Sequence, residues 1–223
     1  MILSAVFLFL IPVSLAVEQE PMLTPPLKTE AANTTNLPDR CPSTTDTFKF
    51  HQEIHLPGLE PFQAICFSNK DIGSGWMEVY FKIGMFFGPT EFHRTFDNYI
   101  NGFNTLEGGH FIGLEKLHIL TSRKPHEALV FNYKDTRYKV KCDNFVMGDR
   151  SEGYSLKQLD GCVGDTRVLN LIQGTKFSTF DHDRDGNPDH NWAEETDHGF
   201  WFSSGEPVLG KYLLLYFLIR RKD

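Results

Sequence analysis

The chain has 223 residues, of which 40% are hydrophobic and 23% are charged, and its formal net charge at pH 7 is −7. This composition is typical of one globular domain of moderate size with enough apolar residues for a core. The lysines and arginines are scattered and the charge balance is acidic, which argues against a nucleic-acid partner.

The first sixteen residues have the pattern of a secretory signal peptide. Residues 2–13 are almost entirely apolar, and Ser14-Leu15-Ala16 supplies small residues that a signal peptidase accepts. The apolar run is shorter than the roughly 20 residues that cross a bilayer, so we predict no membrane span. We expect secretion into the extracellular space, with an N-terminal anchor as the alternative.

Residues 17–40 are rich in Pro, Thr, Asn and Glu and contain few large apolar side chains. Such a segment cannot bury enough apolar surface to fold, so we predict a flexible leader before a domain that spans residues 41–223. Asn33-Thr34-Thr35 within the leader is a glycosylation sequon, and an exposed leader would tolerate a glycan on Asn33.

The domain contains short apolar and aromatic runs separated by Gly, Pro, Asn and Asp, which predicts strands and loops instead of a helical bundle. Strands are expected over residues 76–85 and 126–131. Aromatic residues three and four positions apart predict a helix over residues 91–103, and leucines in phase predict a second, short helix after Gly113.

Four cysteines follow the predicted signal peptide, and an even number in a secreted protein indicates disulfides. Residues 138–163 read as two strands around a polar turn at residues 148–153. Folding this segment about residue 152 places Cys142 opposite Cys162 and leaves Cys41 to pair with Cys66. The alternative for Cys142 and Cys162 is a pair of buried free thiols, because a register slip of one residue would separate them.

Residues 181–189 alternate aspartates with small or polar residues around a glycine. Carboxylates two residues apart in a turning backbone can converge on one hard cation, which predicts a Ca²⁺ site. An EF-hand fits the alternation, but Trp192 stands where its bidentate Glu belongs, and the flanks read as strand and loop. A plain solvated acidic loop is the remaining alternative.

Two other chemistries are weighed for this region. Asp181-His182, Asp189-His190 and Asp197-His198 could recruit zinc, but their spacing is not that of a helical zinc motif. Ser178, Ser203 and Ser204 lack the sequence context of an activated nucleophile, so we predict that the protein is not an enzyme. The aromatic residues around these motifs are favoured as core or site-wall residues over a stacking surface, namely Trp76, Phe177, Trp201 and Phe202.

Residues 213–219 form an apolar run that is too short to cross a membrane. We predict that this run is a final buried strand. If it were unpaired, its edge and apolar face would favour association between molecules.

Several of these motifs, in this order, resemble a fibrinogen-related domain of the ficolin/tachylectin-like family with a shortened C-terminal part. The resemblance covers roughly residues 40 to 212 and rests on separate motifs. These are Gly75-Trp76, Phe92-x-Arg94-x-Phe96-x-x-Tyr99-x-x-Gly102-Phe103, residues 111–121, Asp143-Asn144-Phe145-x-x-Gly148, Tyr154-x-Leu156, Gly164-Asp165 and residues 176–181.

The resemblance implies an α+β fold with a disulfide-linked N-terminal part, a central antiparallel sheet with short helices, and a loop-rich calcium-binding region. It implies that Asp183 and Asp185 bind calcium through their carboxylates, with Asn187 as a carbonyl ligand. Asp181 is then either a weak calcium ligand or a residue that contacts the ligands without touching the ion. Asp189 is less well assigned, because this loop is one residue longer than the family pattern before Asn191.

Departures from the family pattern bear on the ligand. Members that bind acetylated sugars carry a second disulfide, whose cysteines are matched here by Trp192 and Gly205, and about two dozen residues that carry pocket aromatics are missing before residue 213. The resemblance implies a recognition module for microbial or host glycans in innate immunity, with Trp201 and Phe202 as candidate ligand contacts. The alternative is an extracellular protein-binding or adhesion module with a degenerate sugar pocket. Nothing in the sequence indicates an oligomeric state.

Overall fold

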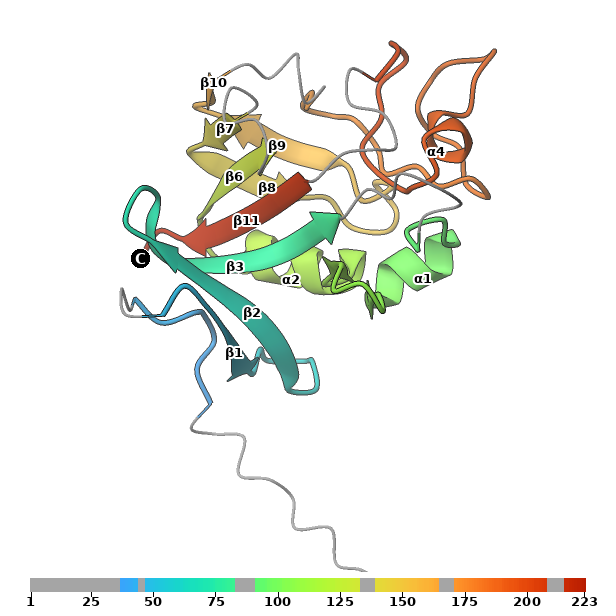
Figure 1. Cartoon of the computed structure of the whole chain (residues 1–223). Coiled ribbons are helices and arrows are strands. Elements are labelled where there is room, and N and C mark those ends of the chain that lie inside the picture. Colours follow the sequence, from blue (N-terminus) through green and yellow to red (C-terminus); the bar gives the residue numbers. More distant parts are fainter. Residues whose placement is uncertain (1–36, 44–46, 83–90, 133–138, 165–170, 208–214) are drawn as a thin grey trace, which may run out of the picture. The chain divides into compact units, whose positions relative to one another are not determined.

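A computed structural model of the chain describes residues 37–43, 47–82, 91–132, 139–164, 171–207 and 215–223 (Figure 1). The predicted signal peptide, most of the predicted leader and Asn33 lie outside these residues. The described part contains no helix that is both long and apolar enough to span a membrane.

The described residues form an antiparallel sheet with short helices, which is the α+β arrangement that the sequence predicts. Its main path runs β1 (Lys49–Ile54), β2 (Phe62–Asn69), β3 (Gly73–Lys82), β11 (Leu215–Arg221), β6 (His126–Asn132), β7 (Lys139–Cys142) and β10 (Val163–Gly164). Two short strands, β4 (Phe103–Asn104) and β5 (His110–Phe111), pair with each other, and β5 also pairs with β3. β8 (Asn144–Met147) and β9 (Leu156–Asp160) form a separate hairpin.

The helices among these residues are α1 (Phe96–Asn101), α2 (Leu114–Arg123) and α4 (Trp192–Glu195). α2 begins directly after Gly113, as predicted. The helix predicted over residues 91–103 is present as α1 but is shorter. It begins five residues later and ends two residues earlier than predicted. Thr95 caps the start of α1, and Gly102, with φ 83°, adopts a conformation that other residues rarely take and ends it.

The two faces of the sheet are buried differently. α1 and α2 lie along the same side of β3 in Figure 1, and their apolar residues join a large core cluster with alternate residues of the central strands, including Val79 of β3 and Phe217 of β11. On the opposite face a second, smaller cluster contains Phe67, Trp76, Leu129 and Leu218. Successive side chains of a strand point to opposite faces of the sheet, so the central strands bury apolar residues on both faces.

The C-terminal apolar run forms the predicted buried strand. β11 lies between β3 and β6; it pairs with β6 along its whole length and with β3 over residues 215–219. Leu215, Phe217 and Ile219 are buried on one face of this strand, and Leu218 is buried on the other. The run is therefore a central strand, and its backbone is not an exposed edge.

Residues at the end of the predicted leader are attached to this strand. Arg221 donates a hydrogen bond to the Asp39 carboxylate at 2.6 Å, and Arg40 bonds to Asp223. Cys41 is joined to Cys66 of β2 by a disulfide. Asp39, Arg40 and Cys41 therefore contact the sheet directly, while the predicted boundary between leader and domain at residue 41 stays a prediction.

Candidate functional site

Asp181 holds the start of the acidic loop against helix α1. Its carboxylate accepts hydrogen bonds from the Phe96 backbone N–H at 3.0 Å and from the Thr179 hydroxyl at 2.7 Å. Phe96 is the first residue of α1, where a carboxylate satisfies an N–H that has no partner within the helix. Asp181, predicted as a weak or outer calcium ligand, therefore joins the loop to the helix through its own hydrogen bonds.

The next acidic residues fold the loop around their own side chains. The Asp183 carboxylate accepts from the backbone N–H of Asp185 at 3.2 Å, and the Asp185 carboxylate accepts from that of Asn187 at 2.7 Å. The Asn187 side-chain oxygen accepts from the N–H of Asp189 at 2.9 Å. These are Asx turns, which hold the backbone in a tight, repeating bend.

Asp185 is the buried member of this loop. Only 4% of its surface is exposed, and its second carboxylate oxygen accepts from the Trp192 backbone N–H at 2.9 Å. Asp183 and Asp189 are exposed on the outer side of the loop. Gly186 has φ 78°, the left-handed conformation that lets the chain turn between the buried and the exposed carboxylates.

The loop residues fit calcium in ligand type. Asp183 and Asp185 offer hard carboxylate oxygens on one turn, and Asn187 follows two residues later. Over the described part of the chain, no three acidic, His or Cys side chains gather into a group that could hold a metal ion.

The three histidines considered for zinc have separate surroundings. His182 stacks on Phe96 with ring centroids 4.4 Å apart, and burial followed by the nearby Arg184 charge lowers its pKa. His190 stacks on Trp192 at 4.6 Å, and its hydrogen bond to a glutamate of α4 raises its pKa. His198 is buried, which lowers its pKa well below the usual value.

Trp201 and Phe202, the predicted ligand contacts, lie in the core. Trp201 has no exposed surface and Phe202 has 3%. The indole N–H of Trp201 donates to the Tyr154 carbonyl at 2.8 Å, and its ring packs against Phe177 and Phe217. This placement matches the core alternative, because the same contacts that bury these rings prevent them from forming the wall of an open pocket.

Two of the serines considered as nucleophiles make hydrogen bonds that hold the loops in place. Ser178 is fully buried, and its hydroxyl accepts from the Arg184 backbone N–H at 2.9 Å. The carbonyl of Ser204 accepts from the Asn187 side chain at 2.8 Å. That the protein is not an enzyme stays a prediction.

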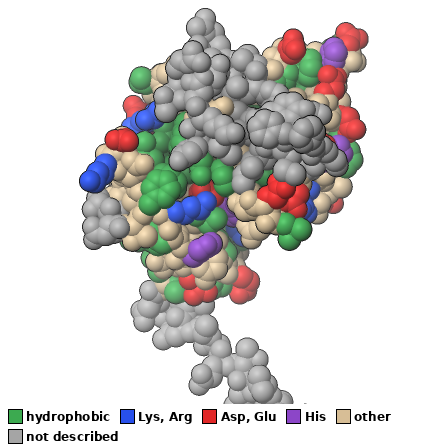
Figure 2. All heavy atoms as spheres, viewed as in Figure 1, with side chains coloured by type: hydrophobic (Ala, Val, Ile, Leu, Met, Phe, Trp, Pro, Cys, Tyr) green, Lys and Arg blue, Asp and Glu red, His purple; other side chains and the backbone are tan. Residues whose placement is uncertain are grey.

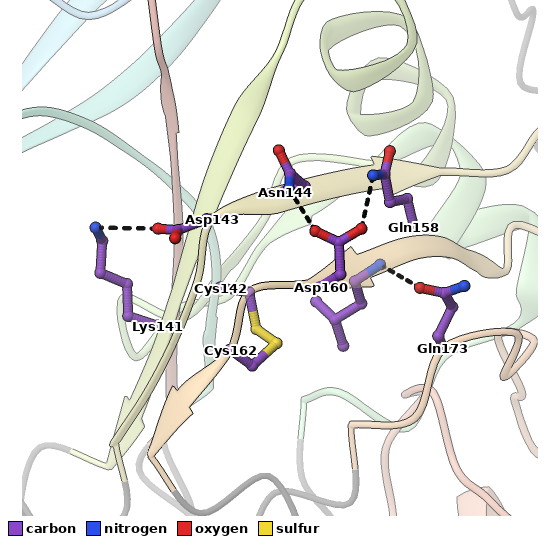
Figure 3. Close-up of a disulfide and its surroundings, with 9 residues drawn as sticks. Lys141, Cys142, Asp143, Asn144, Gln158, Asp160, Cys162 and Gln173 are labelled. Atoms are coloured by element: carbon purple, nitrogen blue, oxygen red, sulfur yellow. Dashed lines mark hydrogen bonds and ion pairs between the residues drawn. A yellow bond between two sulfur atoms is a disulfide. The ribbon is translucent and has the colours of Figure 1, made fainter.

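The second disulfide closes the segment that the sequence predicts as a pair of strands. Cys142 bonds to Cys162 where β7 passes into β8 and β9 passes into β10 (Figure 3). Phe145 lies opposite Leu159, as the predicted register requires. The Asp160 carboxylate accepts from Asn144 of β8, which joins the two strands next to the disulfide, and from Gln158 of its own strand.

Figure 2 shows Asp, Glu and His side chains gathered over the part of the molecule where Figure 1 places α4 and the C-terminal loops. His93 also belongs to this surface, and sequence reasoning missed it because its partner, Phe180, is distant in the chain. His93 stacks on Phe180 with ring centroids 4.3 Å apart and an interplanar angle of 12°. It also missed the setting of His110, which only the pairing of β5 with β3 creates.

The comparisons with known proteins agree on one family. The family model of the fibrinogen beta and gamma chains, C-terminal globular domain, matches residues 48–214. The chain therefore belongs to the fibrinogen C-terminal-domain family. This finding confirms the fibrinogen-related resemblance, whereas its assignment to the ficolin/tachylectin branch stays a prediction.

Curated relatives include angiopoietin-4 of Mus musculus, 31% identical over 65% of this chain, and tenascin of Gallus gallus, 32% identical over 71%. The matched regions make up 28% of that angiopoietin and 9% of that tenascin, so the chain spans only a small part of these relatives.

Solved structures show the same fold. The fibrinogen-like globe domain of human ANGPTL2 has a TM-score of 0.64 at 18% identity, over 83% of this chain and 100% of that chain. The corresponding domain of human ANGPTL6 has a TM-score of 0.63 at 23% identity, over 78% of this chain and 90% of that one.

Proposed function

We propose that this chain is a secreted, non-enzymatic recognition module that binds an extracellular protein through the acidic-loop surface. We define this surface as residues 181–191 together with His93 and Phe180. Calcium, held by Asp183, Asp185 and Asn187, would order it. Glycan recognition in innate immunity is the second candidate function.

The burial of Trp201 and Phe202 carries the preference for a protein ligand. A sugar pocket needs aromatic walls that a ring can reach, and these two residues are committed to the core. The acidic-loop surface instead offers exposed carboxylates and stacked His–aromatic pairs on a backbone held by Asx turns. Rigid, mixed polar and aromatic surfaces of this kind suit protein recognition.

The metal component is tested by thermal unfolding of the chain in calcium, in magnesium and in chelator. A ligand that binds only the folded state at one hundred times its Kd stabilises it by about 2.7 kcal/mol. We expect calcium to raise the melting temperature of the wild type and not that of a variant with Asp183→Ala and Asp185→Asn.

Glu60→Ala, which removes an exposed carboxylate from the segment between β1 and β2, is the control and should respond like the wild type. The comparison uses the calcium-dependent shift of each protein, because Asp185 also binds the backbone and its loss lowers stability without metal. An equal calcium shift in wild type and double variant would remove these residues from the metal site.

The ligand class is tested by binding of the fluorescently labelled chain to intact cells treated beforehand with trypsin or with a mixture of glycosidases. A protein ligand predicts that trypsin abolishes binding and that the glycosidases leave it unchanged. Loss of binding after glycosidase treatment alone would instead support the glycan candidate.

A further inference from the structure

The sheet ends on one side at β1, whose outer edge has no partner strand among the described residues. β1 is the last strand of the sheet path, and β2 pairs with its inner edge over all six residues without a bulge (Figure 1). β1 contains no proline. A regular edge strand of this kind presents a row of backbone N–H and C=O groups to which another strand can bind.

Two hydrogen bonds show which backbone groups of β1 point outward. The Ser68 N–H donates to the Phe48 carbonyl at 3.0 Å, so the backbone groups of Phe48 face β2. The His55 N–H donates to the Pro38 carbonyl at 3.0 Å, on the side away from β2. The backbone groups of successive residues alternate in direction along an antiparallel strand. The residues of β1 whose groups face the open edge are therefore Lys49, His51 and Glu53.

These outward groups are free to bind a partner. Over the described residues, no backbone group bonds to them from outside the β1–β2 pair, and the Glu53 carbonyl accepts only from the neighbouring Gln52 side chain, at 3.1 Å. His51 and Glu53 are exposed. Lys49 keeps 31% of its side chain exposed, although its Nζ lies 2.9 Å from the buried Glu78 carboxylate.

The charges along this edge are complementary to those of a second copy of the chain. In an antiparallel pair centred on His51, Lys49 of one copy lies opposite Glu53 of the other, and the reverse pair forms at the other end. Each outward residue then faces an outward residue, so the copies exchange backbone hydrogen bonds at every such pair. The neighbouring registers would place Lys49 opposite a histidine and lose both Lys–Glu pairs.

We propose that β1 joins two copies of this chain into a symmetric dimer by antiparallel strand addition, so that one sheet continues through both copies. An interface related by a twofold axis uses the same edge of each copy and closes on itself. The β1 residues do not belong to the acidic-loop surface, so the dimer stands apart from the proposed function. The dimer would carry two acidic-loop surfaces, and only the gain in avidity from that rests on the proposed function.

The test measures the mass of the full chain in chelator by sedimentation equilibrium, from micromolar to millimolar concentration. We expect an equilibrium between monomer and dimer. Glu53→Lys places like charges opposite each other at both ends of the strand pair, so it should weaken the dimer at least about tenfold. Glu206→Lys makes the same change of charge at an exposed residue outside β1 and should leave the dimer unchanged.

His51→Pro tests the backbone hydrogen bonds themselves. The His51 N–H points away from β2, so proline removes no bond between β1 and β2 but deprives the centre of the dimer of its donors. We expect this variant to be a monomer at every concentration and to keep the near-UV circular dichroism of the wild type. Glu53→Lys, at an exposed side chain, keeps the test valid if His51→Pro fails to fold.

Amide hydrogen exchange of the wild type locates the interface. The outward amides of Lys49, His51 and Glu53 should become protected as the concentration rises, whereas those of Phe50 and Gln52, which face β2, should be protected throughout. A chain that stays monomeric over this range would overturn the proposal. So would a dimer that forms equally well in Glu53→Lys and His51→Pro, or protection of the outward amides that does not depend on concentration.

Discussion

Single buried polar residues account for much of what is unusual in this domain. Glu78 is fully buried beside Lys49, and burial raises its pKa although the lysine opposes that shift. Lys82 is fully buried as well, and burial lowers its pKa to about 8. His110 and His198 are held neutral by burial. Each of these groups makes the free energy of unfolding depend on pH.

His110 makes the folded chain less stable at acid pH. Its pKa is about 4 in the folded chain against 6.5 for an unperturbed histidine, so the unfolded state binds more protons between these values. Its contribution is fully present above pH 6.5 and is lost as the pH falls towards 4, by up to about 3 kcal/mol. Urea unfolding at pH 7 and pH 4.5 should therefore show a smaller acid-induced loss of stability in His110→Phe than in the wild type.

His190 provides the matched control, because its hydrogen bond to Glu195 raises its pKa. His190→Phe should not reduce the acid-induced loss of stability. If His110→Phe and His190→Phe had the same pH dependence as the wild type, His110 would not be a neutral, buried histidine.

At the scale of elements, short helices and loops are held by bonds from side chains to backbone. α1 has only six residues, too few to be stable by itself, and its start is held by Thr95 and by Asp181 from the acidic loop. The aromatic spacing over residues 91–103 indicated a helix correctly but overestimated its length. Capping by a residue as distant as Asp181 cannot be seen in local periodicity.

Replacing Asp181 tests this coupling between loop and helix. Asp181→Ala removes the acceptor for the Phe96 N–H, so we expect a loss of about 1 kcal/mol in the free energy of unfolding in chelator. The exposed Asp183 makes a single, longer bond to the loop, so Asp183→Ala should cost less under the same conditions. Equal effects in denaturant unfolding would contradict a capping role for Asp181.

At the scale of the whole molecule, β11 joins parts of the chain that are far apart in sequence. It pairs with β3 and β6, and Phe217 on its buried face packs against Phe145 of the β8–β9 hairpin and against Trp201. The C-terminal strand therefore connects the sheet, the hairpin and the loop-rich part in one core.

Truncation of Phe217 should consequently destabilise the entire domain. Phe217 has no exposed surface, and Phe→Ala changes at such positions cost about 3–5 kcal/mol because they leave a cavity. We expect Phe217→Ala to lower the midpoint of urea unfolding strongly. Phe48 is 52% exposed, so Phe48→Ala should change this midpoint little. Similar midpoints for the two variants would show that β11 is not central to the core.

The sequence by itself determined the family, the second helix, the hairpin register with its disulfide, and the buried final strand. Each of these follows from local periodicity or from closely spaced motifs, which depend on neighbours in the chain. Only the tertiary structure decided that Trp201 and Phe202 are buried, that Asp181 caps α1, and that β1 lies at the edge of the sheet. These features depend on which distant segments pack together, and the burial and partners of a side chain are properties of that packing.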